Sequence, residues 1–278
     1  MAILKGFNNR IRGSFGDVTF RQKNGKTIIS ERITSSNGSK TPAQQRHRMK
    51  WANIVKMYKG LLPLFECAFE NKTDNVTDYN MFVKANISVQ PVYLTKEEAA
   101  GDACVVAPYI ITHGSLPAIM VSGTGANCIT NIALGSLVID ESTTIAEFAR
   151  AIVQNNMEYD YYDKIEFIHI EQQVNEATNL PYGIFKTYSV VLDKLNVFPL
   201  LSQVPAEGFT TIDGRLGHLS PAAGDYAYAW VHTRKSSGKT LVSSQSLIDN
   251  NSLLPQYTSE EAYQRAVETY GGEHDKLL

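Results

Sequence analysis

The stretch Val18-Thr-Phe-Arg-Gln-Lys-Asn-Gly-Lys-Thr-Ile-Ile-Ser-Glu-Arg32 predicts a β-hairpin near the start of the chain. Asn24-Gly25 suits a type I′ turn, which needs positive φ at both central positions, and β-forming residues flank it. Gly13 and Gly16 precede the hairpin and indicate a bent or closely packed entry. Because a lone two-stranded hairpin is only marginally stable in water, this one needs a surface to lie on.

A long amphipathic helix is predicted after the hairpin and a short polar linker. Thr41 is the expected N-cap, with Pro42 at the first helical position and Gln44 completing a capping box. Gly60 and Pro63 are expected to kink or divide the helix. Apolar residues recur every three or four positions and so predict one apolar stripe, made of Trp51, Val55, Tyr58, Leu62, Phe65 and Phe69.

Beyond about residue 100 the pattern changes to short strands separated by turn signals. The predicted strands are 103–112, 117–122, 128–139, 164–172, 183–193, 226–234 and 239–248. One helix interrupts them near Ser142–Glu147, and a last helix spans about 258–270. In the fourth strand, Glu166 is expected on the opposite face from His169 and Glu171, so no paired-carboxylate site assembles locally. A polar outer face beside an apolar inner face is predicted instead.

These elements together predict a β-rich α+β protein. We expect an N-terminal β-hairpin and long helix, a β-sandwich-like body with one embedded helix, and a C-terminal helix. The body can be one domain or two subdomains divided near 195–205. The expected divisions are a basic hairpin arm at 1–40, an amphipathic helix and linker at 41–90, the β-rich body at 91–255, and a C-terminal helix and tail at 256–278.

The charge of the chain is unevenly distributed. Residues 1–60 carry thirteen Lys and Arg against two acids, although the net charge of the whole chain is −2. This asymmetry, combined with apolar residues that need burial, predicts a packed docking segment that meets an acidic protein surface or a polyanion. The residues expected at that interface are Phe15, Phe20, Arg21, Arg32, Arg46, Arg48, Lys50, Trp51 and Tyr58.

No motif in the chain predicts catalysis, a cofactor or a metal site. Gly25-Lys26-Thr27 and Gly238-Lys239-Thr240 end like a P-loop, but Phe20 and Thr233 stand where the first glycine is required. The six histidines and three cysteines show no metal-ligand spacing. No apolar run is long enough to span a membrane, and no secretory signal opens the chain. We therefore expect a protein that is not an enzyme, with no catalytic, cofactor-binding or metal residues and no membrane partner.

The run Lys40-Thr-Pro-Ala-Gln-Gln-Arg-His-Arg-Met-Lys-Trp51 resembles an element of many phage and prophage proteins. In those proteins a T-P/E-A-Q-x-x-R-x-x-(F/W) helix follows a basic G-x-x-G-x-V-x-x-R hairpin, which Gly13, Gly16, Val18 and Arg21 match here. The chain also resembles a broad Bacteroidetes family of uncharacterised function with the same opening. The resemblance covers much of the chain, including 226–235 and 241–248, but only the first motif is distinctive.

The resemblance implies a structural protein in the virion of a phage that infects Bacteroidetes, made in the host cytoplasm. The implied positions are the head surface, the head–tail connector or the tail, and the implied partners are other virion subunits, including further copies of the chain. No catalytic residues come with it. One alternative is a nucleic-acid-associated protein that binds phosphates through the basic arm without reading sequence. Another is an enzyme whose site assembles only in three dimensions.

Overall fold

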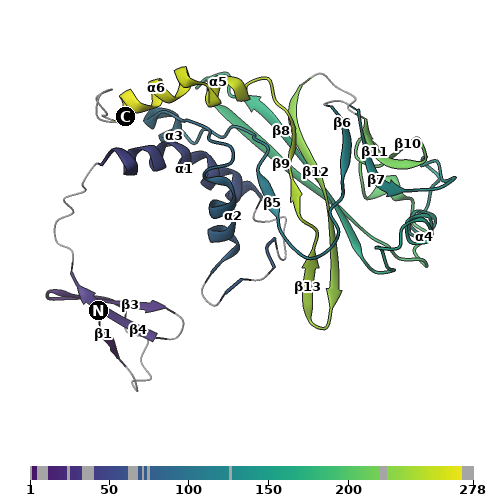
Figure 1. Ribbon diagram of the computed structural model, residues 1–278, viewed down its shortest axis with the longest axis horizontal. Helices are drawn as coiled ribbons and strands as arrows, with labels where there is room; N and C mark the ends of the chain where they lie inside the picture. Colours follow the sequence, from purple (N-terminus) through teal and green to yellow (C-terminus); the bar gives the residue numbers. More distant parts are fainter. Residues whose placement is uncertain are drawn as a thin grey trace. The chain divides into compact units, whose positions relative to one another are not determined.

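The computed structural model describes residues 2–4, 12–23, 26–32, 41–61, 68–70, 72–73, 76–124, 127–219 and 224–270. The chain divides into two compact units, residues 1–41 and residues 42–278 (Figure 1). The predicted 1–40 arm coincides with the first unit to within one residue, and the other predicted divisions all lie in the second. The predicted fold class, a β-rich α+β protein, is confirmed.

The N-terminal unit is a four-stranded antiparallel sheet with the strand order β1-β4-β3-β2. Its strands are β1 (Ala2–Leu4), β2 (Gly13–Phe15), β3 (Val18–Lys23) and β4 (Lys26–Glu31). The predicted hairpin is β3–β4, whose register ends at the pair Lys23 and Lys26; the turn residues Asn24 and Gly25 lie outside the described residues. Sequence patterns missed β1 and β2, since three residues are too few to display an alternation.

Helix α1 (Pro42–Leu61) opens the second unit and begins at the predicted residue. The predicted apolar stripe is wrong at its N-terminal end, because Trp51 is 41% exposed and Val55 is only half-buried. The stripe residues Leu62 and Phe65, together with Pro63, lie outside the described residues. The helix instead turns a neighbouring row of residues to the interior, namely Gln45, Met49, Asn53, Ile54, Met57 and Leu61. Two side chains of that row, Gln45 and Asn53, are polar, so the periodicity of apolar residues in the sequence does not reveal it.

The central sheet of the second unit has the order β13-β12-β8-β9, with β15 also paired to β12. Its strands are β8 (Lys164–Val174), β9 (Pro181–Val191), β12 (Asp225–Ser236), β13 (Lys239–Val242) and β15 (Ile248–Asn250). The predicted strands 164–172, 183–193 and 226–234 are confirmed. Ser237 and Gly238 connect β12 to β13 with φ angles of 50° and 76°, as a two-residue hairpin turn requires.

A smaller sheet, β10-β11-β7-β6, lies beside helix α4 (Ile145–Asn155). Its strands are β6 (Val121–Thr124), β7 (Asn127–Ala133), β10 (Thr210–Ile212) and β11 (Arg215–Leu219). Helix α4 is the predicted embedded helix, and its capping box joins Thr144 to Glu147. Strands β5 (Ile110–Thr112) and β14 (Gln245–Ser246) pair separately. The predicted strand 103–112 therefore shortens to its last three residues.

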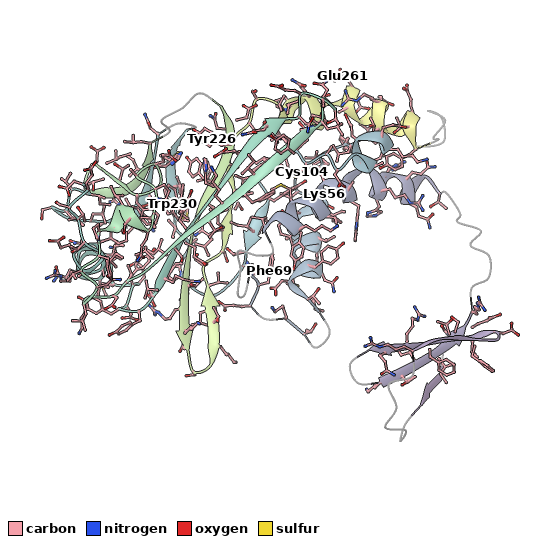
Figure 2. All side chains as sticks on the ribbon, turned by 180° about the vertical axis from the view of Figure 1, so that it is seen from behind. Lys56, Phe69, Cys104, Tyr226, Trp230 and Glu261 are labelled. Atoms are coloured by element: carbon pink, nitrogen blue, oxygen red, sulfur yellow. The ribbon has the colours of Figure 1, made fainter. Side chains whose placement is uncertain are left out.

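Two hydrophobic cores lie on opposite faces of the central sheet (Figure 1). Ile168 and Ile170 of β8 face the helical side, whereas Ile165 and Phe167 face the small sheet and α4. Figure 2 shows Tyr226 and Trp230 on that second side and Cys104 on the helical side. The predicted polar outer face of β8 is therefore wrong for most of the strand: Glu166 is only 5% exposed and pairs with Lys164 at 2.7 Å. Both faces of this sheet are covered by other elements, so its strands show little alternation between apolar and polar residues.

The described part of the second unit also contains five further short helical segments. They are α2 (Asp78–Asn86), α3 (Lys96–Ala100), η2 (Leu200–Ser202), α5 (Leu254–Thr258) and α6 (Glu260–Thr269). The predicted C-terminal helix is confirmed by α6, whose N-cap Ser259 accepts a hydrogen bond from the backbone of Ala262. The chain thus holds more helix than predicted, because α2 lies in the expected 41–90 division, where a linker was predicted after the long helix, and α3 lies in the expected 91–255 body beside the single embedded helix.

Candidate assembly interface

The N-terminal sheet has one apolar face. Directly paired residues of antiparallel strands point to the same side of a sheet, and residues alternate along each strand. Phe15 pairs with Val18, and Phe20 pairs with Ile29. These four side chains therefore share one face, called here the apolar sheet face. Phe15 is 82% exposed and the other three are half-buried.

The opposite face of this sheet is polar and basic. Ser14 and Thr19 hydrogen-bond across β2 and β3 at 3.1 Å, and the Arg21 guanidinium donates to the Ser30 hydroxyl at 3.2 Å. Ile28 is the described apolar residue that β4 contributes to this side, as it alternates with Ile29. The sheet is therefore amphipathic, with its positive charge and its apolar surface on opposite sides.

No residue described in the N-terminal unit belongs to a hydrophobic cluster. A two-layered domain buries the apolar face of a sheet under a second layer, but the described part of this unit contains strands of one sheet alone. A sheet that is hydrophobic on one face must bury that face against another element. The apolar sheet face therefore has the character of a docking surface.

The predicted interface residues separate into three groups. Phe15 and Phe20 lie on the apolar sheet face and Arg21 on the basic face, while Arg32 follows β4 and its N–H donates to the Asp17 carbonyl at 2.6 Å. On α1, Arg46, Arg48 and Trp51 are exposed and Lys50 is half-buried. Tyr58 packs into the core instead, with its ring 5.1 Å from that of Tyr79. The structure therefore does not gather all nine residues onto one surface.

Two cavities lie along the basic face of α1. One of about 290 Å³ is lined by Arg46, His47, Lys50 and Ser88, among others, and one of about 270 Å³ is lined by Arg46, Lys50, Tyr93, Glu260 and Tyr263. The Lys50 ammonium lies 5.9 Å from the centre of the Tyr93 ring. Arg46 and Lys50 thus contribute to both hollows, where they can meet an anionic group.

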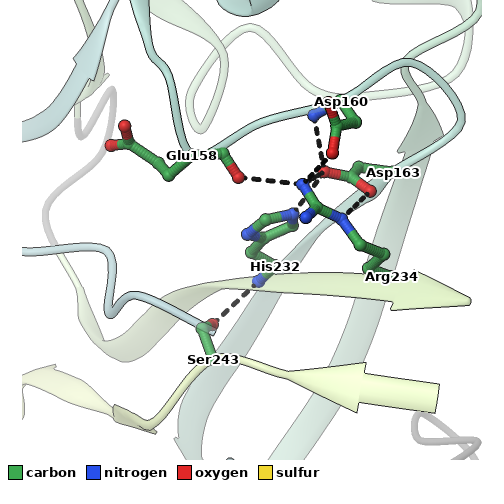
Figure 3. A network of polar contacts seen from close by, with 6 residues as sticks. All are labelled: Glu158, Asp160, Asp163, His232, Arg234 and Ser243. Carbon is green, nitrogen blue, oxygen red and sulfur yellow. Dashed lines mark hydrogen bonds and ion pairs between the residues drawn. The ribbon is translucent and has the colours of Figure 1, made fainter. Parts of the chain in front are cut away.

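A buried ion-pair network lies in the described interior of the second unit (Figure 3). Asp163, 2% exposed at its side chain, accepts hydrogen bonds from His232 Nε2 at 2.8 Å and from Arg234 at 2.8 and 2.7 Å. Burial alone raises the pKa of Asp163, but hydrogen bonds from Arg234 and His232 outweigh it and lower the pKa to about 2. The network joins the 158–163 loop to β12. Sequence reasoning missed it, because about seventy residues separate its members.

This network has the residue types of a Ser–His–Asp triad but not the arrangement. The Ser243 hydroxyl accepts a hydrogen bond from the backbone N–H of His232 at 3.0 Å, and no bond from it to the His232 ring is present. His232 and Ser243 are both fully buried. A substrate needs access to the nucleophile, so we assign this cluster a structural role.

Comparison with protein-family models, curated proteins and solved structures finds no match to this chain. The resemblance to phage proteins therefore stays a prediction. Among the described residues, no group of three or more His, Cys, Asp or Glu is placed to hold a metal ion. No helix in the described ranges combines the length and the apolar character needed to cross a membrane.

Proposed function

We propose that the protein is a structural subunit of a phage virion, at the head surface, the connector or the tail, and that it assembles through its N-terminal unit. The observation that carries this proposal is the apolar sheet face, on which Phe15 remains 82% exposed. Burying it on another subunit removes apolar area from water, which drives most protein association. The virion setting rests on the resemblance of the 40–51 run and the preceding hairpin to phage proteins.

Adjacent isoleucines on opposite faces of β4 provide a matched test of assembly. Ile29→Ser places a hydroxyl on the apolar sheet face, whereas Ile28→Ser makes the same change on the other face. We expect the native mass, measured by light scattering after size exclusion, to show an oligomer for the wild type and for Ile28→Ser, and smaller species for Ile29→Ser. Equal masses for all three proteins would contradict assembly through this face.

Removal of residues 1–40 tests the same proposal on the whole segment. We expect the remaining chain to stay folded, because its cores lie entirely within 42–278, but to lose its assembled mass. Circular dichroism checks the fold and light scattering the mass. The virion setting is tested separately, by searching purified phage particles for peptides of this protein by mass spectrometry.

A second candidate function is non-specific binding of nucleic acid. It is favoured by the exposed Arg46 and Arg48 on α1, with Arg46 and Lys50 lining both cavities there. When a protein binds nucleic acid through phosphates, the logarithm of its binding constant falls linearly with the logarithm of the salt concentration. The slope is set by the number of phosphates contacted. Arg46→Ala with Arg48→Ala would then lower that slope for a DNA duplex. If no DNA binding occurs at low salt, this candidate is excluded.

A further inference from the structure

Helix α1 carries positive charge without matching acids of its own. Residues 42–61 contain five Lys and Arg and no acid. Lys56 forms an ion pair with Asp102, whereas neither Arg46 nor Lys50 has an ion-pair partner in the part of the chain that the structure describes. Arg46 and Lys50 lie four residues apart on the helix, a spacing at which like charges repel. An anion bound between them therefore relieves an unfavourable interaction.

The hollow of about 290 Å³ beside α1 has the side chains of a phosphate site. Arg46 and Lys50 line it together with His47 and with Ser88, which follows α2. Arginine, lysine and serine side chains are among the groups that hold phosphate oxygens in complexes with nucleic acid. The described lining of this hollow includes no acid. The hollow therefore suits an anionic group that accepts several hydrogen bonds, as a phosphate does.

The neighbouring hollow of about 270 Å³ shares Arg46 and Lys50 but is also lined by aromatic rings. Tyr93 and Tyr263 meet edge to face there, with their ring centres 5.2 Å apart. Aromatic side chains beside a phosphate-binding group commonly recognise an unpaired nucleobase. Glu260 also lines this hollow and disfavours a second anion, but a carboxylate can accept a hydrogen bond from the amino group of a base such as cytosine. This hollow therefore suits the aromatic part of a nucleotide.

The elements that line the two hollows are fixed to one another. Met49 of α1 is buried against α6, and its carbonyl accepts a hydrogen bond from the Leu94 N–H at 3.3 Å. The N–H of Tyr93 donates to the Tyr257 carbonyl at 2.8 Å. A site held in this way loses little conformational entropy when it binds a ligand.

We infer that the two hollows together bind a nucleoside phosphate, with its phosphate group between Arg46 and Lys50 and its base against Tyr93 and Tyr263. The ligand is either one unit of a single strand of nucleic acid or a free nucleotide, which share this chemistry. The inference rests on the second candidate function and narrows it from any nucleic acid to one that offers an unpaired base. It does not depend on assembly through the apolar sheet face.

The simplest rival is a solvated basic surface that attracts phosphates without a built site. Such a surface uses every exposed base, including Arg48, which lies on α1 but lines neither hollow. It also binds duplex DNA at least as well as a single strand, because the duplex carries the denser phosphate charge. The bases of a duplex are stacked and paired, so they do not enter the tyrosine-lined hollow unless the duplex is opened. The two explanations therefore differ in the variants and the probes that they predict to matter.

The charge test compares three single variants of the full-length protein. The probe is a short, fluorescently labelled DNA strand of mixed sequence, and binding is measured by fluorescence anisotropy at low salt. Arg46→Gln and Lys50→Gln should each raise the Kd for the strand at least about tenfold, because a charged hydrogen bond to phosphate is lost. Arg48→Gln is the matched control, since it removes the same charge from the same helix, and it should bind like the wild type. Circular dichroism verifies that all variants are folded.

The base test concerns the rings of the second hollow. Tyr263→Leu should raise the Kd for the strand at least about fivefold through loss of contact with the base, whereas Tyr263→Phe, which keeps the ring, should bind like the wild type. Tyr257→Leu is the matched control, since Tyr257 is also half-buried but lines neither hollow. The inhibition constant of inorganic phosphate as a competitor should be the same for the wild type and Tyr263→Leu, because phosphate has no base.

The probes complete the test. The duplex of the same sequence should bind at least about tenfold more weakly than the single strand, because its bases must first be unpaired. Competition by 5′-CMP identifies the source of the ligand: an affinity at least equal to that of the strand assigns a free nucleotide, and a lower one assigns a nucleic acid. Duplex binding as tight as that of the strand, or an effect of Arg48→Gln as large as that of Arg46→Gln, would overturn the inference and leave the second candidate function in place. If strand, duplex and 5′-CMP all fail to bind at low salt, both are overturned.

Discussion

The side-chain amide of Asn53 pairs with both backbone polar groups of Val105: its Nδ2 donates to the carbonyl at 2.9 Å and its Oδ1 accepts from the N–H at 2.7 Å. Its Nδ2 also donates to the Tyr109 hydroxyl at 2.9 Å. All three residues are buried. The backbone at 103–107 is buried without belonging to a strand, so side chains such as Asn53 supply the partners that a neighbouring strand would otherwise provide.

Replacement of Asn53 by alanine should therefore destabilise the second unit strongly. Two buried backbone groups lose their partners, each at a cost of about 1–3 kcal/mol, which gives about 2–6 kcal/mol in all. Urea unfolding followed by circular dichroism measures the change. Lys59→Ala on the same helix is the control, because an exposed substitution changes stability by less than about 0.5 kcal/mol. An Asn53→Ala variant as stable as that control would refute the assigned role.

The 103–107 segment shows where sequence reasoning reaches its limit. Ala103–Ala107 are apolar and wholly buried, as a central strand would be, and the predicted strand 103–112 followed from that pattern. What decides the outcome is the set of polar partners, Asn53, Gln172 and Asn251, which lie far away in sequence. Local patterns predicted β8, β9, β12, α4 and α6 well, because periodicity and caps are local signals.

Helix α1 gives a second prediction, which separates the buried row from the predicted stripe. Met49 is fully buried against Ala266 and Val267 of α6, whereas Trp51 is 41% exposed and touches the Tyr79 ring edge-on at 6.3 Å. Met49→Ala should cost about 2–5 kcal/mol through the cavity it leaves. Trp51→Ala should cost about 1 kcal/mol, the value of an aromatic pair. Thermal and urea unfolding of both variants provide the comparison, and a larger cost for Trp51→Ala would restore the predicted stripe.

The candidate interface was predictable in part for a similar reason. Hairpin chemistry and charge asymmetry pointed to the N-terminal segment and to Phe15 and Phe20, which the pairing places on one face. The exposure of Leu195, Val197 and Phe198 carried no signal, because a short apolar run in sequence is as compatible with a core as with a surface. It depends on how α4 holds the loop that contains these residues, which is a tertiary property.

The pair Asp163–Arg234 supports a third prediction. Arg234→Ala leaves a carboxylate that is 2% exposed with the His232 ring as its remaining side-chain partner, and removal of one member of a buried pair costs about 3 kcal/mol. Arg265→Ala is the matched control, since Arg265 is half exposed and lies 3.9 Å from Glu98, a separation at which surface pairs contribute little. Urea unfolding at pH 7 measures both; a similar small effect for the two variants would argue against a stabilising network.

The same pair predicts a dependence on acid. The folded pKa of Asp163 lies near 2, below its unfolded value of about 3.9. Its contribution is therefore fully present above about pH 4 and is lost as the pH falls toward 2. In Arg234→Ala this acid-dependent loss should be smaller, because less of the stabilisation of the carboxylate remains to be lost.

His218 predicts a loss of stability in a separate and higher pH window. The ring is 1% exposed and packs 4.0 Å from that of Tyr228, and Nδ1 lies 2.8 Å from the Glu207 carbonyl. A carbonyl can only accept, so the neutral ring carries its proton on Nδ1. Nε2 has no partner among the described residues, so a second proton there would be buried without an acceptor. Burial accordingly lowers the pKa of His218 to about 4.

Because the unfolded chain binds this proton near pH 6.5, the folded state loses stability as the pH falls from about 6.5 to 4, by about 3 kcal/mol. Above about pH 7.5 the ring is neutral in both states and contributes no pH dependence. His218→Asn keeps a donor for the Glu207 carbonyl but cannot titrate. Urea unfolding of both proteins from pH 8 to 4 gives the free energy of unfolding at each pH. The two plots of this free energy against pH should be parallel above pH 7.5 and should converge below pH 6.5, because only the wild type loses stability through this histidine. Parallel curves throughout would mean that the buried ring accepts a proton as readily as it does in the unfolded chain.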